Sequence, residues 1–210
     1  MIYICDDFFD NSYAIRKAAL ESNYSSASDH SWPGYRCWDV PDYVTNFIRF
    51  KARKILNDER VDFDNERTQI VGLPNSSFQY IPKEYGDGMF HADPHQYICI
   101  VYLSLESPVC SGTEVSDISM RNNSLPGNIS TQKVTKLLRE HYGDISNLIK
   151  RYRYGKLKKE LNSYFKNSCV VANKFNRCVI FPANNFHRAQ NFFGTSVGNG
   201  RLTSVSFLNK

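Results

Sequence analysis

The triplet His91-Ala92-Asp93 and the distant His187 are the side chains of this sequence best suited to chemistry. Two imidazoles and one carboxylate on one side of a metal ion leave its opposite side open, as in non-haem Fe(II) centres that react with O2. Fourteen residues after His187, Arg201 supplies a fixed positive charge. A guanidinium can hold a carboxylate through two parallel hydrogen bonds. These residue types predict a reaction class and leave the substrate open.

Strand geometry is expected to bring these ligands together. Side chains two positions apart point to the same side of a strand, so His91 and Asp93 can reach one ion. His187 follows a strand-like run at 179–182 and would add a third ligand from a neighbouring strand. Because a hard carboxylate stands beside two imidazoles, the set suits Fe(II) better than a structural zinc site.

Each of these residues also has an ordinary structural interpretation. A His-x-Asp triplet is a weak pattern, and a histidine in an apolar run is more often a core residue with satisfied hydrogen bonds. His95 lies two residues beyond Asp93 and competes as a ligand, although Pro94 is expected to turn the chain away. Arg201 has the alternative of a surface ion pair on an edge strand.

Hydrophobic periodicity predicts the elements that must position these residues. A short strand at 2–4 is followed by a helix that Asp10 or Ser12 caps and that ends near residue 22. A loop at 25–38 and a second helix at 41–57 come next. Short strands rich in β-branched and aromatic residues are then expected. Their predicted ranges are 68–73, 77–81, 89–93, 96–105, 113–115, 169–172, 177–181, 186–193 and 201–208.

A helical insertion separates the two groups of strands. Apolar residues recur at helical spacing over 130–166, with breaks expected near Gly143 and Gly155. Residues 131–166 hold ten lysines and arginines against three acidic residues, a net charge of +7, whereas the whole chain carries +5. The basic excess therefore belongs to this one segment.

The order of elements predicts an α+β protein with a mainly β core. Helices followed by at least eight short strands favour a jelly roll (cupin-like, a double-stranded β-helix) buttressed by N-terminal helices. We expect one domain over residues 1–210, with helical support at 1–67. The barrel core would comprise 68–115 and 168–210, and the basic helical insertion 116–167.

Composition narrows the class of protein. A chain of 210 residues, 41% hydrophobic and 22% charged, suits one globular domain. The N-terminus lacks the pattern of a signal peptide, and no apolar run approaches the roughly 20 residues that span a bilayer. The six cysteines form no CxxC pair, which favours reduced thiols. We therefore expect a cytoplasmic protein without a membrane partner.

The sequence around these residues resembles the Fe(II)- and 2-oxoglutarate-dependent dioxygenases, most of all their prolyl-4-hydroxylase-like branch. The resemblance covers residues 78–115 and 176–208. It rests on Phe78-Gln-Tyr80 and a Gly-containing turn before His91-Ala-Asp93, on Ile100-Val-Tyr-Leu-Ser104, on Ser111-Gly-Thr-Glu114, and on Phe181-Pro182 with His187 and Arg201-Leu-Thr203. The long gap between His187 and Arg201 and the large basic insertion depart from the branch, so its substrate cannot be carried over.

The resemblance implies a cofactor set and a reaction. Fe(II) would be held by His91, Asp93 and His187, and 2-oxoglutarate and O2 would take the open positions, with ascorbate as an optional reductant. The implied reaction hydroxylates a C–H bond and releases succinate and CO2. The side chains implied to hold 2-oxoglutarate are Arg201, Thr203, Tyr102 and Tyr80.

Three functions remain open at this stage. The first is a hydroxylase of a peptidyl or free amino acid, hence with a peptidyl or small-molecule substrate. The second is an oxygenase acting on nucleic acid, since a basic segment such as 131–166 can follow phosphates, although such a segment is often a solvated helical face. The third is a non-catalytic β-barrel binding module with structural histidines. The oligomeric state is left open.

Overall fold

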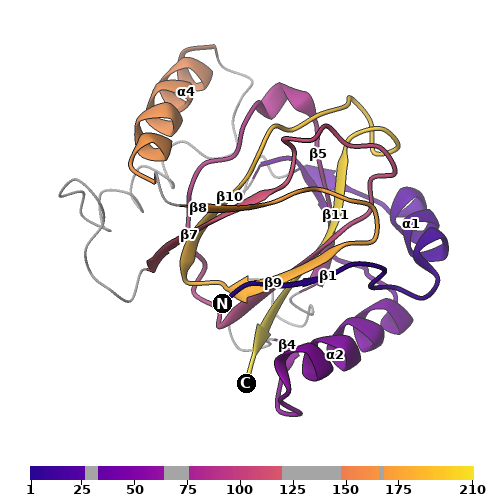
Figure 1. The fold of residues 1–210 in the computed structure, drawn as a ribbon. Coiled ribbons are helices and arrows are strands. Elements are labelled where there is room, and N and C mark those ends of the chain that lie inside the picture. Colours follow the sequence, from indigo (N-terminus) through magenta and orange to yellow (C-terminus); the bar gives the residue numbers. More distant parts are fainter. Residues whose placement is uncertain (27–32, 64–75, 120–147, 166–167) are drawn as a thin grey trace.

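A computed structural model of the chain contains two antiparallel β-sheets that face each other, with helices on their outer sides (Figure 1). The structure describes residues 1–26, 33–63, 76–119, 148–165 and 168–210. This architecture is the predicted mainly β core supported by N-terminal helices.

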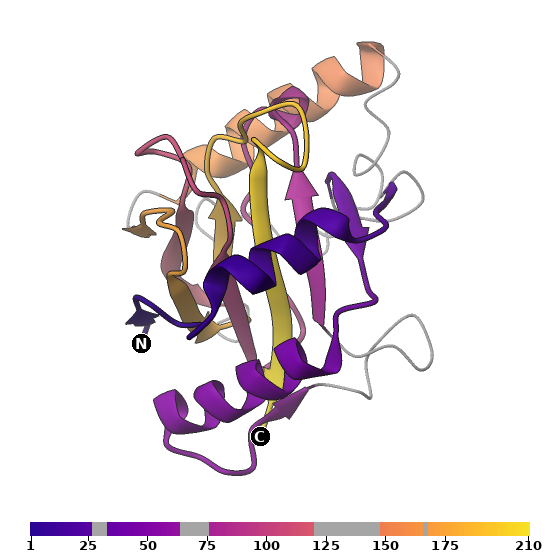
Figure 2. The same cartoon turned by 90° about the vertical axis from the view of Figure 1, so that its right-hand side faces the viewer.

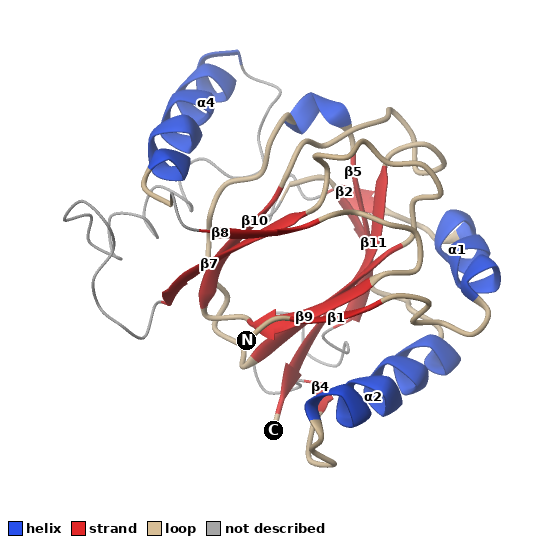
Figure 3. Cartoon of the chain, in the orientation of Figure 1, coloured by secondary structure: helices blue, strands red, loops and turns tan. Residues whose placement is uncertain are grey.

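The larger sheet has the strand order β1-β9-β6-β11-β5-β3-β2, and β4 pairs with one end of β11 (Figure 3). Its strands are β1 (Tyr3–Cys5), β2 (Ser25–Ser26), β3 (Tyr35–Cys37), β4 (Asp62–Phe63), β5 (Ser76–Ile81), β6 (Tyr97–Tyr102), β9 (Cys178–Pro182) and β11 (Arg201–Asn209). The smaller sheet has the order β10-β7-β8. Its strands are β7 (Thr113–Ser119), β8 (Ser168–Val171) and β10 (Asn185–Ala189).

The larger sheet buries both of its faces. Val101 and Leu202 point to the helix-facing side and join the core formed with the helices. Tyr102 and Val205 point to the other side, called here the inward face, where they pack with Val115 of the smaller sheet. Burial on both faces explains why β6 and β9 are nearly continuous apolar runs.

Helices α1 (Ser12–Glu21) and α2 (Asp42–Leu56) cross the helix-facing side of the larger sheet (Figure 2). The side-chain oxygen of Asn11 caps α1 by accepting a hydrogen bond from the backbone N–H of Ala14 at 3.3 Å. The prediction of a cap at Asp10 or Ser12 is therefore wrong, because the residue directly before the first helical turn is an equally good acceptor.

The predicted boundaries of α2 agree with the structure to within one residue. Pro41 precedes its first turn, where its missing N–H costs nothing. The helix ends at Asn57, which adopts a left-handed conformation with φ 49°, a backbone region that asparagine tolerates better than most residues. Among the described helices, none combines the length and apolarity needed to cross a membrane.

Helix α4 (Leu148–Ser163) is the described part of the basic insertion. It continues through Gly155, so the predicted break there is wrong. A Cβ at Gly155 would have open space around it, and a helix tolerates an interior glycine at a cost of about 1 kcal/mol relative to alanine. Leu161 and the following Phe165 pack against Phe90 and Phe186 at the smaller sheet. The predicted break at Gly143 lies outside the described residues.

The strands differ from prediction in several places. β10 ends at Ala189 where residues 186–193 were predicted, and β7 continues to Ser119 where 113–115 were predicted. The predicted loop at 25–38 contains β2 and β3, because tertiary pairing with β5 extends this polar segment. The short strand β4 was not predicted. The predicted strand at 68–73 lies outside the described residues, and the one at 89–93 is wrong for reasons that concern the site itself.

Candidate metal centre

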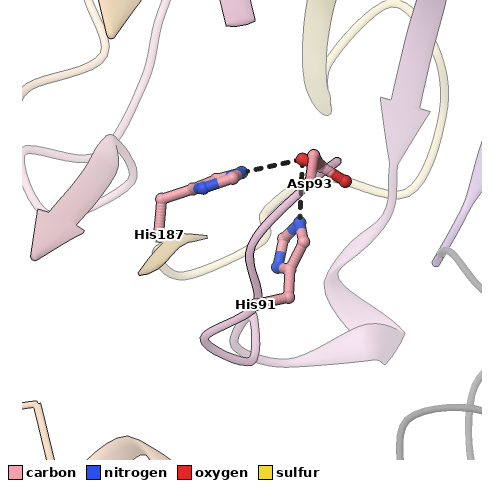
Figure 4. A group of neighbouring side chains, drawn as sticks. All are labelled: His91, Asp93 and His187. Carbon is pink, nitrogen blue, oxygen red and sulfur yellow. Dashed lines mark ion pairs between the residues drawn. The ribbon is translucent and has the colours of Figure 1, made fainter. Parts of the chain in front are cut away.

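His91, Asp93 and His187 converge on one point between the two sheets (Figure 4). One nitrogen of each histidine and one oxygen of Asp93 all lie within 4.8 Å of one another. Nε2 of His187 is 3.2 Å from Oδ2 of Asp93, and Nε2 of His91 is 3.8 Å from the same oxygen. The predicted grouping of these three residues is thus present in the structure.

The three residues come from β10 and from the ligand loop, defined as residues 86–96 before β6. His91 and His187 form an isolated β-bridge, with backbone N–H to carbonyl distances of 3.0 and 2.8 Å. The Asp93 N–H then donates to the carbonyl of Ala183 at 2.8 Å. The ligand loop therefore contacts β10 through separate hydrogen bonds at Gly88 and His91 and then turns away, so no continuous strand forms over 89–93. The fixed backbone still directs both side chains to one point.

Both histidines are held in the tautomer that presents Nε2 as the metal-binding nitrogen. Nδ1 of His91 lies 2.9 Å from the carbonyl of Met89, and Nδ1 of His187 lies 2.8 Å from the carbonyl of Asn185. A carbonyl can only accept, so each Nδ1 carries the proton and donates it. Each Nε2 is left with a lone pair directed at Asp93, and such backbone partners commonly fix the orientation of metal-binding histidines.

The electrostatics also favour a neutral imidazole beside an ionised carboxylate. Burial lowers the pKa of His91, and the neighbouring His187 lowers it further. Burial by itself would raise the pKa of Asp93, but the close contacts with His187 and His91 outweigh it, so the net pKa shift is downward. Neutral nitrogen donors and one anionic oxygen donor fit Fe(II) or a similar divalent cation.

A second polar group lies on the inward face near the start of β11. The side chain of Arg201 is buried, and its Nη2 donates to Oγ1 of Thr113 at 3.4 Å. Its Nε and the Oγ1 atom of Thr203 are buried and make no hydrogen bond within the described residues. Burial lowers the pKa of Arg201. A carboxylate suits this site. It could accept hydrogen bonds from the buried guanidinium, and its negative charge would compensate the cost of removing the guanidinium from water.

Tyr102 belongs to this same group. Its hydroxyl donates to Oγ1 of Thr113 at 2.6 Å, and the guanidinium of Arg201 lies 5.6 Å from the centre of its ring. Burial raises the pKa of Tyr102, so the phenol stays protonated. Thr113 itself was not predicted as a site residue. The alternation of β7, which places Thr113 on the same side as Val115, is the signal that points to it.

Tyr80 and His95 belong neither to the three converging residues nor to the polar group around Arg201. Tyr80 pairs with Leu202 across β5 and β11, so it points to the helix-facing side, where its ring stacks on Tyr35 at 5.7 Å. The structure does not bring Tyr80 to Arg201, which points to the opposite face. His95 packs its ring 4.2 Å from that of Phe207 and is not one of the three converging residues.

Several solved structures share this architecture. HygX from Streptomyces hygroscopicus, with nickel and 2-oxoglutarate bound, gives a TM-score of 0.57 at 10% identity over 99% of this chain and 82% of that one. AviO1 from Streptomyces viridochromogenes Tue57 gives 0.53 at 12%, over 100% and 89%. A Pseudomonas putida prolyl-4-hydroxylase gives 0.51 at 12%, over 100% and 92%. The chain has the jelly-roll fold of the Fe(II)- and 2-oxoglutarate-dependent oxygenases, as the sequence resemblance predicted.

The family assignment is more specific than the fold. Residues 1–208 match a family of unknown function, DUF6445, and the chain belongs to this family. A sequence comparison with curated proteins finds no match.

Proposed function

We propose that this protein is an Fe(II)- and 2-oxoglutarate-dependent oxygenase that hydroxylates a C–H bond of a small or peptidyl substrate, with an amino acid as the preferred class. Succinate and CO2 would be the co-products. The observation that carries the proposal is the convergence of His91, Asp93 and His187 in a fold where a buried arginine, Arg201, points into the same interior.

The spacing of the two groups suits a short diacid. Val115 of β7 lies opposite His187, and Thr113, two residues earlier on the same strand, contacts Arg201. Two residues of a strand span roughly 7 Å. A five-carbon diacid can cover that distance with one end at the metal and the other at the guanidinium.

Each residue of the chain has a definite task in this proposal. His91, Asp93 and His187 would hold the iron, which when bound with 2-oxoglutarate and O2 supplies the oxidising power for C–H cleavage. Arg201 binds the far carboxylate of 2-oxoglutarate, and the hydroxyl of Thr203 adds a hydrogen bond.

Tyr102 and Thr113 act through orientation. The protonated Tyr102 hydroxyl holds Thr113, whose own oxygen also accepts from Arg201, so the guanidinium is fixed before the cosubstrate arrives. The inward apolar cluster around Val179 and Phe181 excludes water from the region between the two groups. Preorganisation of this kind lowers the entropic cost of binding.

The preference for a small or peptidyl substrate draws on the similar structures. One HygX structure contains hygromycin B together with nickel and 2-oxoglutarate, and another similar structure is a prolyl-4-hydroxylase. The nucleic-acid alternative has less support, because Lys158 of the basic segment donates to the backbone of Asp87 at 2.6 Å and thus serves the fold. A non-catalytic β-barrel module would not explain why both histidines have a fixed tautomer or why the guanidinium of Arg201 is buried.

Formation of succinate tests the proposal. Wild-type protein supplied with Fe(II), 2-oxoglutarate and O2 should release succinate, and His187→Ala should abolish this while its circular dichroism stays unchanged. His95→Ala removes a neighbouring imidazole from outside the ligand set and serves as the matched control for metal binding. If wild-type protein gives no succinate above the His187→Ala background with any amino acid or peptide supplied, the proposal is wrong.

A further inference from the structure

A row of polar side chains crosses the inward face of the larger sheet. Residues paired directly across neighbouring strands point to the same side. The pairings run from β6 through β11 and β5 to β3, and the residues in this row are Tyr102, Thr203, Gln79 and Arg36. The first two belong to the proposed cosubstrate site. Gln79 and Arg36 extend the row beyond it, in a barrel interior that is otherwise mainly apolar.

Arg36 is a buried cation directed into this interior. Its residue exposure is 9%, compared with 2% for Arg201. Its Nη1 lies 3.5 Å from Oγ of Ser77, which pairs with the inward-facing Val205. The ring of Trp38 lies 5.4 Å from the guanidinium carbon. Such a contact with an aromatic face restricts the orientation of a guanidinium.

Arg36 lies on the same inward face as Arg201 but further towards the β3 edge of the larger sheet. Arg201 pairs with Ile81 of β5, two residues along that strand from Gln79, whereas Arg36 lies one strand further out. Strand spacing and rise place the Cα atoms of the two arginines roughly 12 Å apart. Since the far carboxylate of 2-oxoglutarate is assigned to Arg201, Arg36 is the candidate for a second carboxylate.

We propose that Arg36 binds a carboxylate of the substrate, so that the oxygenase acts on a free amino acid or on the C-terminus of a peptide. This inference rests on the proposed function, since it names the substrate class of the same site. The guanidinium supplies a planar pair of donors to the carboxylate. The Ser77 hydroxyl and the Gln79 amide lie on the same face as further hydrogen-bonding groups, and the opposite end of the substrate is held towards the metal.

The test measures ligand binding without turnover. Protein loaded with Ni(II) and 2-oxoglutarate is titrated with free L-amino acids and their carboxamides, and with acetylated tripeptides ending in a carboxylate or an amide. The rise in melting temperature reports binding. We expect the probes with a free carboxylate to bind, and the matching amides to give no rise in melting temperature. Response to amino acids alone identifies a free amino acid as the substrate class, and response to tripeptides identifies a peptide C-terminus.

Three variants separate the role of Arg36 from general destabilisation. Arg36→Gln should weaken binding of the carboxylate probes roughly tenfold to a hundredfold, the usual effect of losing a charged hydrogen-bonding partner. Arg36→Lys keeps the charge without the planar fork and should give an intermediate loss. Arg49→Gln removes an equally charged side chain, on α2 and paired with Asp62, and should bind like wild type.

The same experiment distinguishes failure of this inference from failure of the proposed function. If 2-oxoglutarate alone does not stabilise Ni(II)-loaded wild-type protein, the proposed function is wrong. If it does, but carboxylates and amides bind alike or neither binds, the role of Arg36 is wrong. The role is also overturned if Arg36→Gln weakens 2-oxoglutarate binding itself, because Arg36 would then belong to the cosubstrate site.

Discussion

Nδ2 of Asn162 on α4 lies 3.0 Å from the carbonyl oxygen of Gly88, in the ligand loop that carries His91. Oδ1 of the same side chain accepts a hydrogen bond from the N–H of Phe90, also at 3.0 Å. Between these two residues lies Met89, whose carbonyl receives the Nδ1 proton of His91. The end of the basic insertion is therefore connected to the metal centre through one short stretch of backbone.

The first prediction follows from this connection. Asn162→Ala should lower the free energy of unfolding by about 1–3 kcal/mol, because it removes two hydrogen bonds to buried backbone. It should also weaken divalent metal binding by up to roughly tenfold, the lower end of the effect of residues that orient metal ligands. Titration with Ni(II) measures the affinity. Asn46→Ala, which removes a contact to Arg49 on the exposed part of α2, is the matched control and should leave metal binding unchanged.

The nucleic-acid alternative has its own test in α4. Deletion of 131–166 would remove Leu161 and Phe165 from the core, so loss of activity after deletion would not be informative. Lys156 and Lys159 are exposed instead. Reversing both to glutamate should leave succinate formation unchanged. If DNA or RNA binding supports the function, the same variant should flatten the salt dependence of binding by about two units of log–log slope. Fluorescence anisotropy with labelled oligonucleotides decides between these outcomes.

The pH dependence of stability should carry a contribution from Asp6 at the N-terminus. Arg177 and Lys174 donate hydrogen bonds to its carboxylate at 2.6 and 2.8 Å and hold the pKa of Asp6 well below its ordinary value of 3.8. A lowered pKa in the folded state means that the stabilisation is complete above the ordinary pKa and is lost as the pH falls below it.

The third prediction is therefore a pH-dependent effect of Asp6→Asn. Near neutral pH the variant should be less stable than wild type by roughly 0.5–1 kcal/mol, a modest figure because the pair is partly exposed and screened by solvent. The difference should shrink as the pH falls below 3.8. Urea unfolding at several pH values measures it. Asp10→Asn, whose carboxylate is more exposed, should have a smaller effect, and equal effects of the two variants would contradict the prediction.

The sequence was sufficient to group the three candidate metal ligands but not to predict their surroundings. His91, Asp93 and His187 are recognisable from residue type and order, and they converge although the expected strand is replaced by a bridge. The face of a strand that is buried on both sides is harder to predict. All six residues of β5 are buried, so alternation within that strand could not show that Tyr80 points to the helices and Gln79 inward.

Contacts between segments that are distant in the chain could not be predicted from the sequence either. Arg36 enters the interior because β3 pairs with β5 in a particular register, and a single polar segment gives no sign of that pairing. Asn162 meets the ligand loop because α4 packs its apolar residues there. Both depend on tertiary packing, whereas hydrophobic periodicity reports on one element at a time.

The fourth prediction concerns the cosubstrate. Arg201→Ala should raise the KM for 2-oxoglutarate roughly tenfold to a hundredfold, because a buried, charged hydrogen-bonding partner is lost. Arg201→Lys should recover part of the loss, since it restores the charge but not the planar pair of donors. Ni(II) affinity should stay at the wild-type value in both variants, because neither side chain touches the metal ligands.

Thr203→Val provides the graded comparison for this prediction. It removes one hydroxyl whose Oγ1 makes no hydrogen bond within the described part of the chain, so the fold should be unaffected. The KM for 2-oxoglutarate should rise by less than in Arg201→Ala, about three- to tenfold, as expected for one uncharged hydrogen bond. Steady-state rates of succinate formation give the KM for 2-oxoglutarate of each variant. An unchanged KM in Arg201→Ala would mean that the far carboxylate binds elsewhere, and with it the interpretation of the polar row on the inward face would have to change.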